Sequence, residues 1–203
     1  MNRNAIAQWL AWGISLIFHP IFVPFYAVLL FFYISPYYFY DFGKILRLIF
    51  IQAILIPIMV VYLLYQLKIL QSFFLRTVKA RMYLSLFLAV IYFVLYRSVS
   101  GVASLDEIGV LFLGIAYALL ISALANAFGI KISLHLVALG GWTAFLLQWS
   151  WVHRFPLLDI LAPVVLLTGL VAAARYYLKA HGLGELLLGW LTGMVGILLA
   201  VMF

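Results

Sequence analysis

The feature that most constrains this chain is a series of long apolar runs that contain no Lys, Arg, Asp or Glu. There are seven of them, at 6–34, 48–67, 82–96, 108–130, 133–152, 160–174 and 186–203. Their lengths are comparable to the ~20 residues that an α-helix needs to cross the ~30 Å hydrocarbon core of a bilayer. They are continuously apolar and do not alternate, which argues against a membrane β-barrel. We therefore expect an all-α, polytopic transmembrane helical bundle of about six to seven spans.

Composition agrees with this interpretation. Charged residues make up 8% of the chain and apolar residues 69%, whereas an ordinary soluble domain has about 25% and roughly half. No linker, charge run or low-complexity tract divides the sequence, so we expect one integral-membrane domain over 1–203. The net charge of +7 is spread along the chain and offers no basic face, so no nucleic-acid partner is expected. The absence of cysteine excludes disulfides and thiolate metal sites.

The first run is longer than a simple span. As one helix, 6–34 would extend about 44 Å at 1.5 Å per residue, well beyond the hydrocarbon thickness. His19-Pro20 and Pro24 lie near its middle, and each proline removes a backbone hydrogen bond. We expect a long first helix that is kinked at His19-Pro20.

The segment between the last two runs carries the most informative polar residues, Arg175, His181 and Glu185. His181 and Glu185 are four positions apart, so they share one face if the last helix begins near His181. The carboxylate can then hold one ring nitrogen and leave the other free, as in a histidine that acts as a base or nucleophile. Gly182 and Gly184 would let the backbone turn and let a ligand approach closely.

A second cluster opens the fifth run with Lys131, Ser133 and His135. Lysine supplies a point charge, serine a hydroxyl and histidine a titratable proton. The free N–H groups at the start of a helix also favour an anion. This cluster is therefore typical of a phosphate-binding position.

A third cluster opens the third run with Arg76, Lys79 and Arg81. Two spans separate it from the second cluster, and two more separate the second cluster from His181. We therefore expect all three clusters on one side of the membrane, where they can form one site. Eight of the twelve Lys and Arg residues fall on that side, but four Lys and Arg residues remain on each side when the proposed site cations are left out, namely Lys79, Arg81, Lys131 and Arg175. The charges thus leave open whether the site faces the cytoplasm or the periplasm.

Two of these patterns resemble signatures of the type-2 phosphatidic acid phosphatase superfamily. Arg175-x5-His181-x3-Glu185 is similar to its third signature, Ser-Arg-x5-His-x3-Asp, and Ser133-Leu134-His135 is similar to its second, Pro-Ser-Gly-His. The two spans between these motifs and the single span after the last one also match the family. The chain looks like a small bacterial integral-membrane member.

The match has departures. Ala174 stands where the superfamily has Ser, Leu134 where it has Gly, and Glu185 where it has Asp. The first signature, Lys-x6-Arg-Pro, fits least well, and Lys79 with Arg81 is the preferred equivalent.

The resemblance implies hydrolysis of a lipid phosphomonoester or diphosphate through a phosphohistidine, without metal or other cofactor. The implied substrates are an isoprenoid diphosphate, phosphatidic acid or phosphatidylglycerol phosphate in a bacterial inner (cytoplasmic) membrane, which the chain would cross several times. His181, oriented by Glu185, would attack phosphorus. His135 would protonate the leaving group and then activate water. Five residues would hold the phosphoryl oxygens: Lys79, Arg81, Lys131, Ser133 and Arg175. Cationic side chains suit this task because phosphoryl transfer needs positive charge around the equatorial oxygens.

Two other functions stay open. A non-catalytic lipid-phosphate binding protein or transporter would keep the cationic pocket without the chemistry. A haem or quinone protein would use histidines between helices as ligands, although a haem would need two opposed imidazoles. Arg76 and His19 are secondary site candidates, His19 because an ionisable group inside an apolar run is costly. The sequence leaves the oligomeric state open.

Overall fold

The structure, a computed structural model, describes residues 3–35, 42–68 and 78–202. Every regular element in these ranges is helical, which confirms the expected all-α bundle for the described part of the chain. The helices are α1 (Arg3–Ile17), α2 (Val23–Ile34), α3 (Phe42–Phe50), α4 (Ile56–Gln66), α5 (Val78–Val99), α6 (Asp106–Ala127), α7 (Leu134–His153), α8 (Leu158–Tyr177) and α9 (Leu183–Val201). A π-helical segment (Ile51–Leu55) joins α3 to α4, and a 3-10 turn (Ala103–Leu105) precedes α6.

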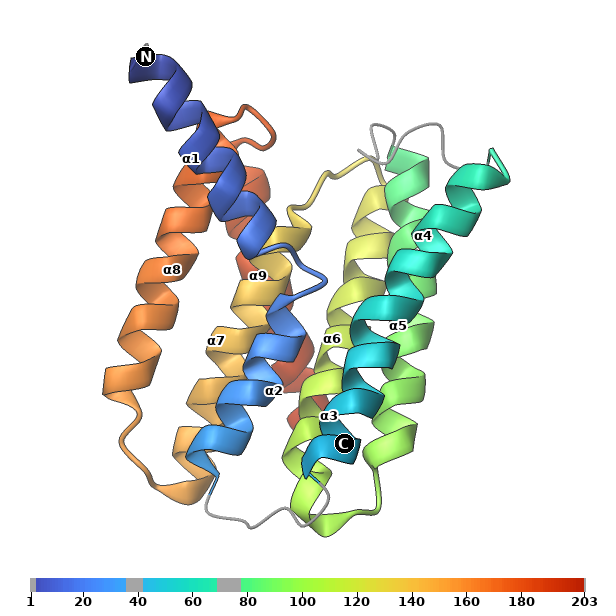
Figure 1. Cartoon of the computed structure of the whole chain (residues 1–203), viewed down its shortest axis with the longest axis vertical. Helices are drawn as coiled ribbons and strands as arrows, with labels where there is room; N and C mark the ends of the chain where they lie inside the picture. Colours follow the sequence, from blue (N-terminus) through green and yellow to red (C-terminus); the bar gives the residue numbers. More distant parts are fainter. Residues whose placement is uncertain (1–2, 36–41, 69–77, 203) are drawn as a thin grey trace.

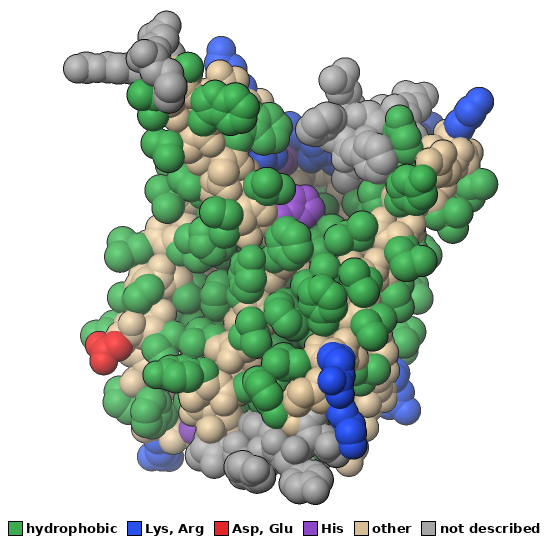
Figure 2. All heavy atoms as spheres, viewed as in Figure 1, with side chains coloured by type: hydrophobic (Ala, Val, Ile, Leu, Met, Phe, Trp, Pro, Cys, Tyr) green, Lys and Arg blue, Asp and Glu red, His purple; other side chains and the backbone are tan. Residues whose placement is uncertain are grey.

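Five helical segments of the described chain are long and apolar enough to cross a membrane. They are Phe42–Gln66, Val78–Val99, Asp106–Ala127, Leu158–Tyr177 and Leu183–Val201. Their outward faces expose many large apolar side chains. Figure 2 shows hydrophobic side chains across the middle of the molecule and Lys and Arg mainly towards its two ends. By length and composition, this is a multi-pass membrane protein.

The run 6–34 forms two helices, although the sequence predicted one long helix kinked at His19-Pro20. α1 ends at Ile17 and α2 begins at Val23, and the backbone N–H of Phe22 donates to the carbonyl of His19 at 2.8 Å. Pro20 has no N–H to continue α1, and Pro24 lies in the first turn of α2, where its missing N–H does no harm. The two prolines therefore account for a turn at 18–22.

A further proline, Pro57, shapes the start of α4. Pro57 lies in the first turn of α4, directly after the π-helical segment Ile51–Leu55. A proline ring collides with the carbonyl four residues earlier, here that of Ala53, and a wider π turn relieves such a collision. Ala53 and Pro57 both line a cavity inside the bundle.

The centre of the bundle is formed by α6, α7 and α9. Figure 1 shows α4 and α5 on one side of this centre and α1, α2 and α8 on the other. A Cβ added to Gly140 of α7 would overlap the backbone of Trp190 of α9, and one added to Gly193 of α9 would overlap the backbone of Val137 of α7. Glycine therefore permits the close approach of α7 and α9, as small residues do between helices in membranes.

The α6–α7 and α8–α9 connections lie at the end of the bundle that carries the N-terminus (Figure 1). Because α7 and α9 both begin there, their close packing also sets the distance between their first turns. Those turns carry His135 and Glu185, with His181 just before α9.

Replacement of Gly140 by alanine should destabilise the bundle by about 1–3 kcal/mol, because the new methyl group meets backbone that cannot move aside. Gly169→Ala in α8 is the matched control, because no atom lies within 4 Å of the Cβ position there. That variant should be neutral or more stable by up to about 1 kcal/mol. Thermal unfolding of the detergent-purified proteins measures both, and equal stability of the two variants would contradict the close α7–α9 contact.

Candidate functional site

A cavity of about 480 Å³ begins among the helix ends that carry the predicted motifs and continues into the bundle. The His and Arg residues of its lining are His19, Arg81, His135, Arg175 and His181. The rest of the lining is almost wholly apolar and includes Leu16, Pro57, Val61, Leu84, Leu88, Tyr92, Ile115 and Leu119. Figure 2 shows a histidine in a hollow of this face, with Lys or Arg side chains behind it. The cavity thus has one cationic part and a long apolar wall.

His181 is positioned by the turn between α8 and α9. Lys179 adopts a left-handed backbone with φ of 51°, and the N–H of Ala180 donates to the carbonyl of Arg175 at 3.1 Å. Gly182 is the N-cap of α9, so Glu185 lies in its first turn, where the helix dipole favours a carboxylate. His181 Nδ1 lies 2.7 Å from Glu185 Oε2. A carboxylate accepts, so Nδ1 carries the proton and Nε2 keeps its lone pair. The expected i, i+4 contact is therefore present.

Lys131 connects the two loops that carry the motifs. Its Nζ donates to the carbonyl of Ala180 at 2.7 Å and lies 3.3 Å from Glu185 Oε2. The backbone N–H of Ser133 donates to the backbone carbonyl of Glu185 at 3.2 Å. Lys131 does not line the cavity. Its contacts are therefore with Ala180 and Glu185, and its predicted role as a phosphate ligand stays a prediction.

His135 is held by the backbone of α1, the N-terminal helix. It is 8% exposed, and its Nε2 lies 3.1 Å from the backbone carbonyl of Ser15 in α1. A carbonyl only accepts, so Nε2–H donates and Nδ1 keeps the free lone pair. The ring of His19, from the α1–α2 turn, meets the His135 ring edge to face with centroids 5.4 Å apart. Three histidines therefore share the lining of one cavity.

Arg81 and Arg175 bring two guanidinium groups to the cavity from the start of α5 and the end of α8. Arg175 Nε is buried and has no hydrogen-bond partner among the described residues. The same holds for the hydroxyls of Ser15 and Ser133. A buried polar group without a partner costs about 1–3 kcal/mol. An anion in the cavity would give the Arg175 donor an acceptor.

The other predicted residues lie elsewhere. Lys79 is exposed and is not part of the cavity lining, although it is only two positions from Arg81. Ser133 is fully buried and also does not line the cavity. Arg76 lies outside the described residues. A helix turns by 100° per residue, so positions two apart point to different sides, which explains why only one of Lys79 and Arg81 reaches the cavity.

Burial sets the electrostatics of His181. The residue is only 7% exposed, and this burial lowers the pKa of its imidazole to about 4, because the charged form loses hydration. The hydrogen bond that His181 donates to Glu185 raises the pKa, and the charges of Lys131, Arg81 and Arg175 lower it further. His181 is therefore a neutral imidazole at neutral pH, with the Nε2 lone pair available.

No group of three or more His, Asp or Glu side chains in the described part of the chain is close enough to hold a metal ion.

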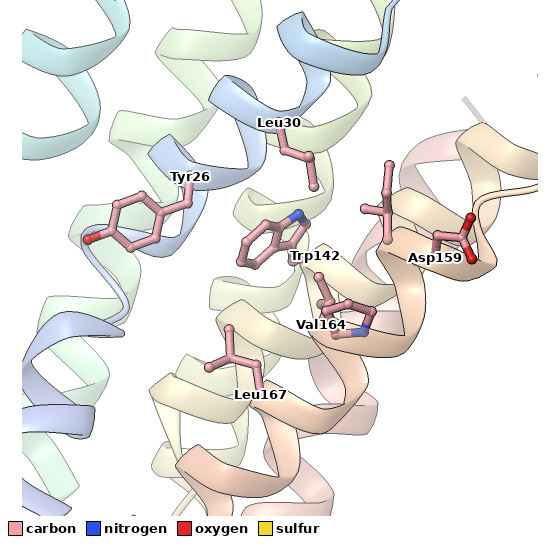
Figure 3. A pocket seen from close by; sticks show the side chains of 8 residues that line it. Tyr26, Leu30, Trp142, Asp159, Val164 and Leu167 are labelled. Carbon is pink, nitrogen blue, oxygen red and sulfur yellow. The ribbon is translucent and has the colours of Figure 1, made fainter. Parts of the chain in front are cut away.

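A second hollow, of about 400 Å³, lies between α2, α7 and α8. Figure 3 shows Trp142 there between Leu30 and Val164, with Asp159 at the edge. This hollow has no cationic residue in its lining and does not suit a phosphate.

Sequence reasoning missed Ser15 and the apolar wall. Ser15 belongs to no motif, and its contact with His135 is made by a backbone carbonyl across 120 positions of sequence. The wall residues named above are ordinary apolar residues of four different helices, α1, α4, α5 and α6, and only the tertiary packing places them on one side of the cationic groups. Comparisons with protein-family models, with curated proteins and with solved structures find no match to this chain.

The His181 ring should titrate near pH 4 and should stay neutral at pH 6.5, the ordinary midpoint for histidine. Its pKa is lower in the folded than in the unfolded protein, so the stability it contributes is present above pH 6.5 and is lost as the pH falls towards 4. NMR of ring-labelled histidine in micelles measures this titration, with His181→Ala identifying the signal. A midpoint near 6.5 would contradict the buried position.

Proposed function

We propose that this chain is an integral-membrane lipid phosphatase that works like the type-2 phosphatidic acid phosphatases, through a phosphohistidine and without a metal ion. The observation that carries this function is the presence of His181, oriented by Glu185, in the same cavity as His135, Arg81 and Arg175. A nucleophile, a second histidine and two guanidinium groups are the parts that phosphoryl transfer through a phosphohistidine uses.

His181 Nε2 is the nucleophile. Its lone pair forms the N–P bond while the P–O bond to the lipid breaks and its electron pair stays on the departing oxygen. Glu185 accepts the hydrogen bond from Nδ1–H, which holds the ring in place and stabilises the positive charge that develops on it. Lys131 keeps the carboxylate in position.

Arg81 and Arg175 hold the phosphoryl oxygens. A guanidinium group presents parallel N–H donors that match phosphate geometry, and the two groups supply charge where the transition state needs it. The unpartnered Nε of Arg175 is a ready donor for one of these oxygens.

His135 serves the second step. Its Nε2–H is committed to the Ser15 carbonyl, so Nδ1 is the nitrogen that can take a proton from water. The activated water attacks phosphorus, the N–P bond breaks, and its electron pair returns to His181 as inorganic phosphate leaves.

The apolar wall favours a substrate with a long hydrocarbon part, such as an isoprenoid diphosphate, phosphatidic acid or phosphatidylglycerol phosphate. Leu84, Leu88 and Ile115 offer such a chain a dry surface next to the cationic groups. We further propose that the seven apolar runs cross a bacterial inner membrane and that the three motif clusters lie on one side of it.

Detergent-purified protein should release phosphate from lipid phosphates with EDTA present. His181→Ala should reduce the release to the uncatalysed background, because no N–P bond can form. Quenching with alkaline SDS after reaction with ³²P-labelled substrate should trap a phosphohistidine in the wild type but not in His181→Ala, because the N–P bond survives base and is cleaved by acid. Equal phosphate release by wild type and His181→Ala would refute the function, and lipid-phosphate binding without turnover would favour a binding protein or transporter.

Arg81→Ala should lower kcat/KM by about 10²–10³-fold, because a positioned donor to the transition state is lost. Arg97→Ala is the matched control, since Arg97 is an exposed arginine at the other end of the same helix. That variant should keep the wild-type rate within about twofold. Similar losses in the two variants would mean that Arg81 acts only through the overall charge or stability of α5.

A further inference from the structure

His19 stands at the boundary between the two parts of the cavity. The lining residues next to it in sequence, Leu16, Pro20 and Pro24, are apolar, while its ring meets that of His135 on the polar side. Arg175 is close enough to act electrostatically on both His19 and His135. In a lipid phosphate, the oxygen that joins the phosphate to the apolar chain occupies this same boundary. His19 is therefore well placed to meet that oxygen.

The proton of the His19 ring is on the nitrogen that can reach a ligand. The backbone N–H of Ile21 points to His19 Nδ1 at 3.4 Å. A backbone N–H only donates, so Nδ1 accepts and the ring proton is on Nε2. No described residue accepts a hydrogen bond from this Nε2–H.

The other two histidines of the cavity have already committed their protons. His181 Nδ1–H donates to Glu185 and His135 Nε2–H donates to the carbonyl of Ser15. Each offers a ligand only a lone pair. His19 is thus the one histidine among the described residues of this cavity that offers a donor.

We propose that His19 is a third catalytic histidine, whose Nε2–H donates a hydrogen bond to the departing lipid oxygen. This inference rests on the phosphatase function proposed above, and it gives to His19 the leaving-group role that the family resemblance implies for His135. As His181 forms the N–P bond, the P–O bond breaks and the electron pair stays on the departing oxygen, where His19 stabilises the negative charge. No proton leaves His19 in this step, and the alkoxide then takes its proton from water.

The contribution of such a donor depends on the leaving group. An alkoxide is strongly basic and gains much from a hydrogen bond in the transition state, whereas 4-nitrophenolate is a weak base and gains little. The comparison of dodecyl phosphate with 4-nitrophenyl phosphate therefore isolates the role of His19. Partial misfolding of a variant would lower both activities equally and would leave their ratio unchanged.

His19→Asn should lower kcat/KM for dodecyl phosphate by about 10²-fold or more and for 4-nitrophenyl phosphate by less than about tenfold. Asparagine keeps an acceptor for the Ile21 N–H but has no group at the Nε2 position. His19→Gln, whose amide can reach that position, should recover part of the dodecyl phosphate activity. An unchanged ratio of the two activities in both variants would overturn the inference.

Two further variants separate this inference from the proposed function. His135→Asn should lower kcat for both substrates to the same value, leave kcat/KM unchanged for both and accumulate phosphohistidine, because hydrolysis of the intermediate is common to both substrates. If His181→Ala abolishes turnover while His19→Asn changes neither activity, the His19 role is wrong and the phosphatase function stands. If His181→Ala leaves turnover unchanged, both are wrong.

Discussion

The geometry of the site depends on Glu185. Its carboxylate accepts from His181 Nδ1 at 2.7 Å and lies 3.3 Å from Lys131 Nζ, and its backbone carbonyl accepts from Ser133 N–H. One residue therefore joins the α6–α7 connection to the α8–α9 connection. The carboxylate and Lys131 are both partly exposed, so the ion pair contributes only about 0–1 kcal/mol to stability. Its larger effect is to hold the His181 ring in one orientation and one tautomer.

Glycine contacts within the bundle complete this arrangement. Apolar side chains gain little from association in lipid, so helices in a membrane are held by close packing and by polar contacts. Gly140 and Gly193 bring α7 and α9 together along their length, and the first turns of these helices carry His135 and Glu185. On the other side, the prolines at 20 and 24 interrupt the N-terminal run and place Ser15 and His19 against His135. The site is thus a consequence of where the helices begin and break.

Much of the fold could be predicted because its signals are local. Uncharged apolar runs predict helices, and the spacing of His181 and Glu185 predicts their contact once α9 begins at Leu183. The prolines predicted only a kink at His19-Pro20, whereas the structure has two separate helices there. The direction in which a side chain points could not be predicted from such local signals. Lys79 and Arg81 are equally good cations in the sequence, but only Arg81 lines the cavity. Lys131 has the positive charge expected of a phosphate ligand, but its ammonium group contacts Glu185 and the carbonyl of Ala180.

The sequence by itself determined that the chain is a helical membrane bundle, because a bilayer requires long apolar segments whose backbone groups are satisfied within the segment. It also placed the motif residues at one end of the bundle, because successive helices alternate in direction. Only the tertiary structure decided which of those residues share the cavity and which nitrogen of each histidine carries the proton. These properties depend on contacts between residues far apart in the chain, such as that of His135 with the Ser15 carbonyl, and a backbone carbonyl has no side-chain signature in a sequence.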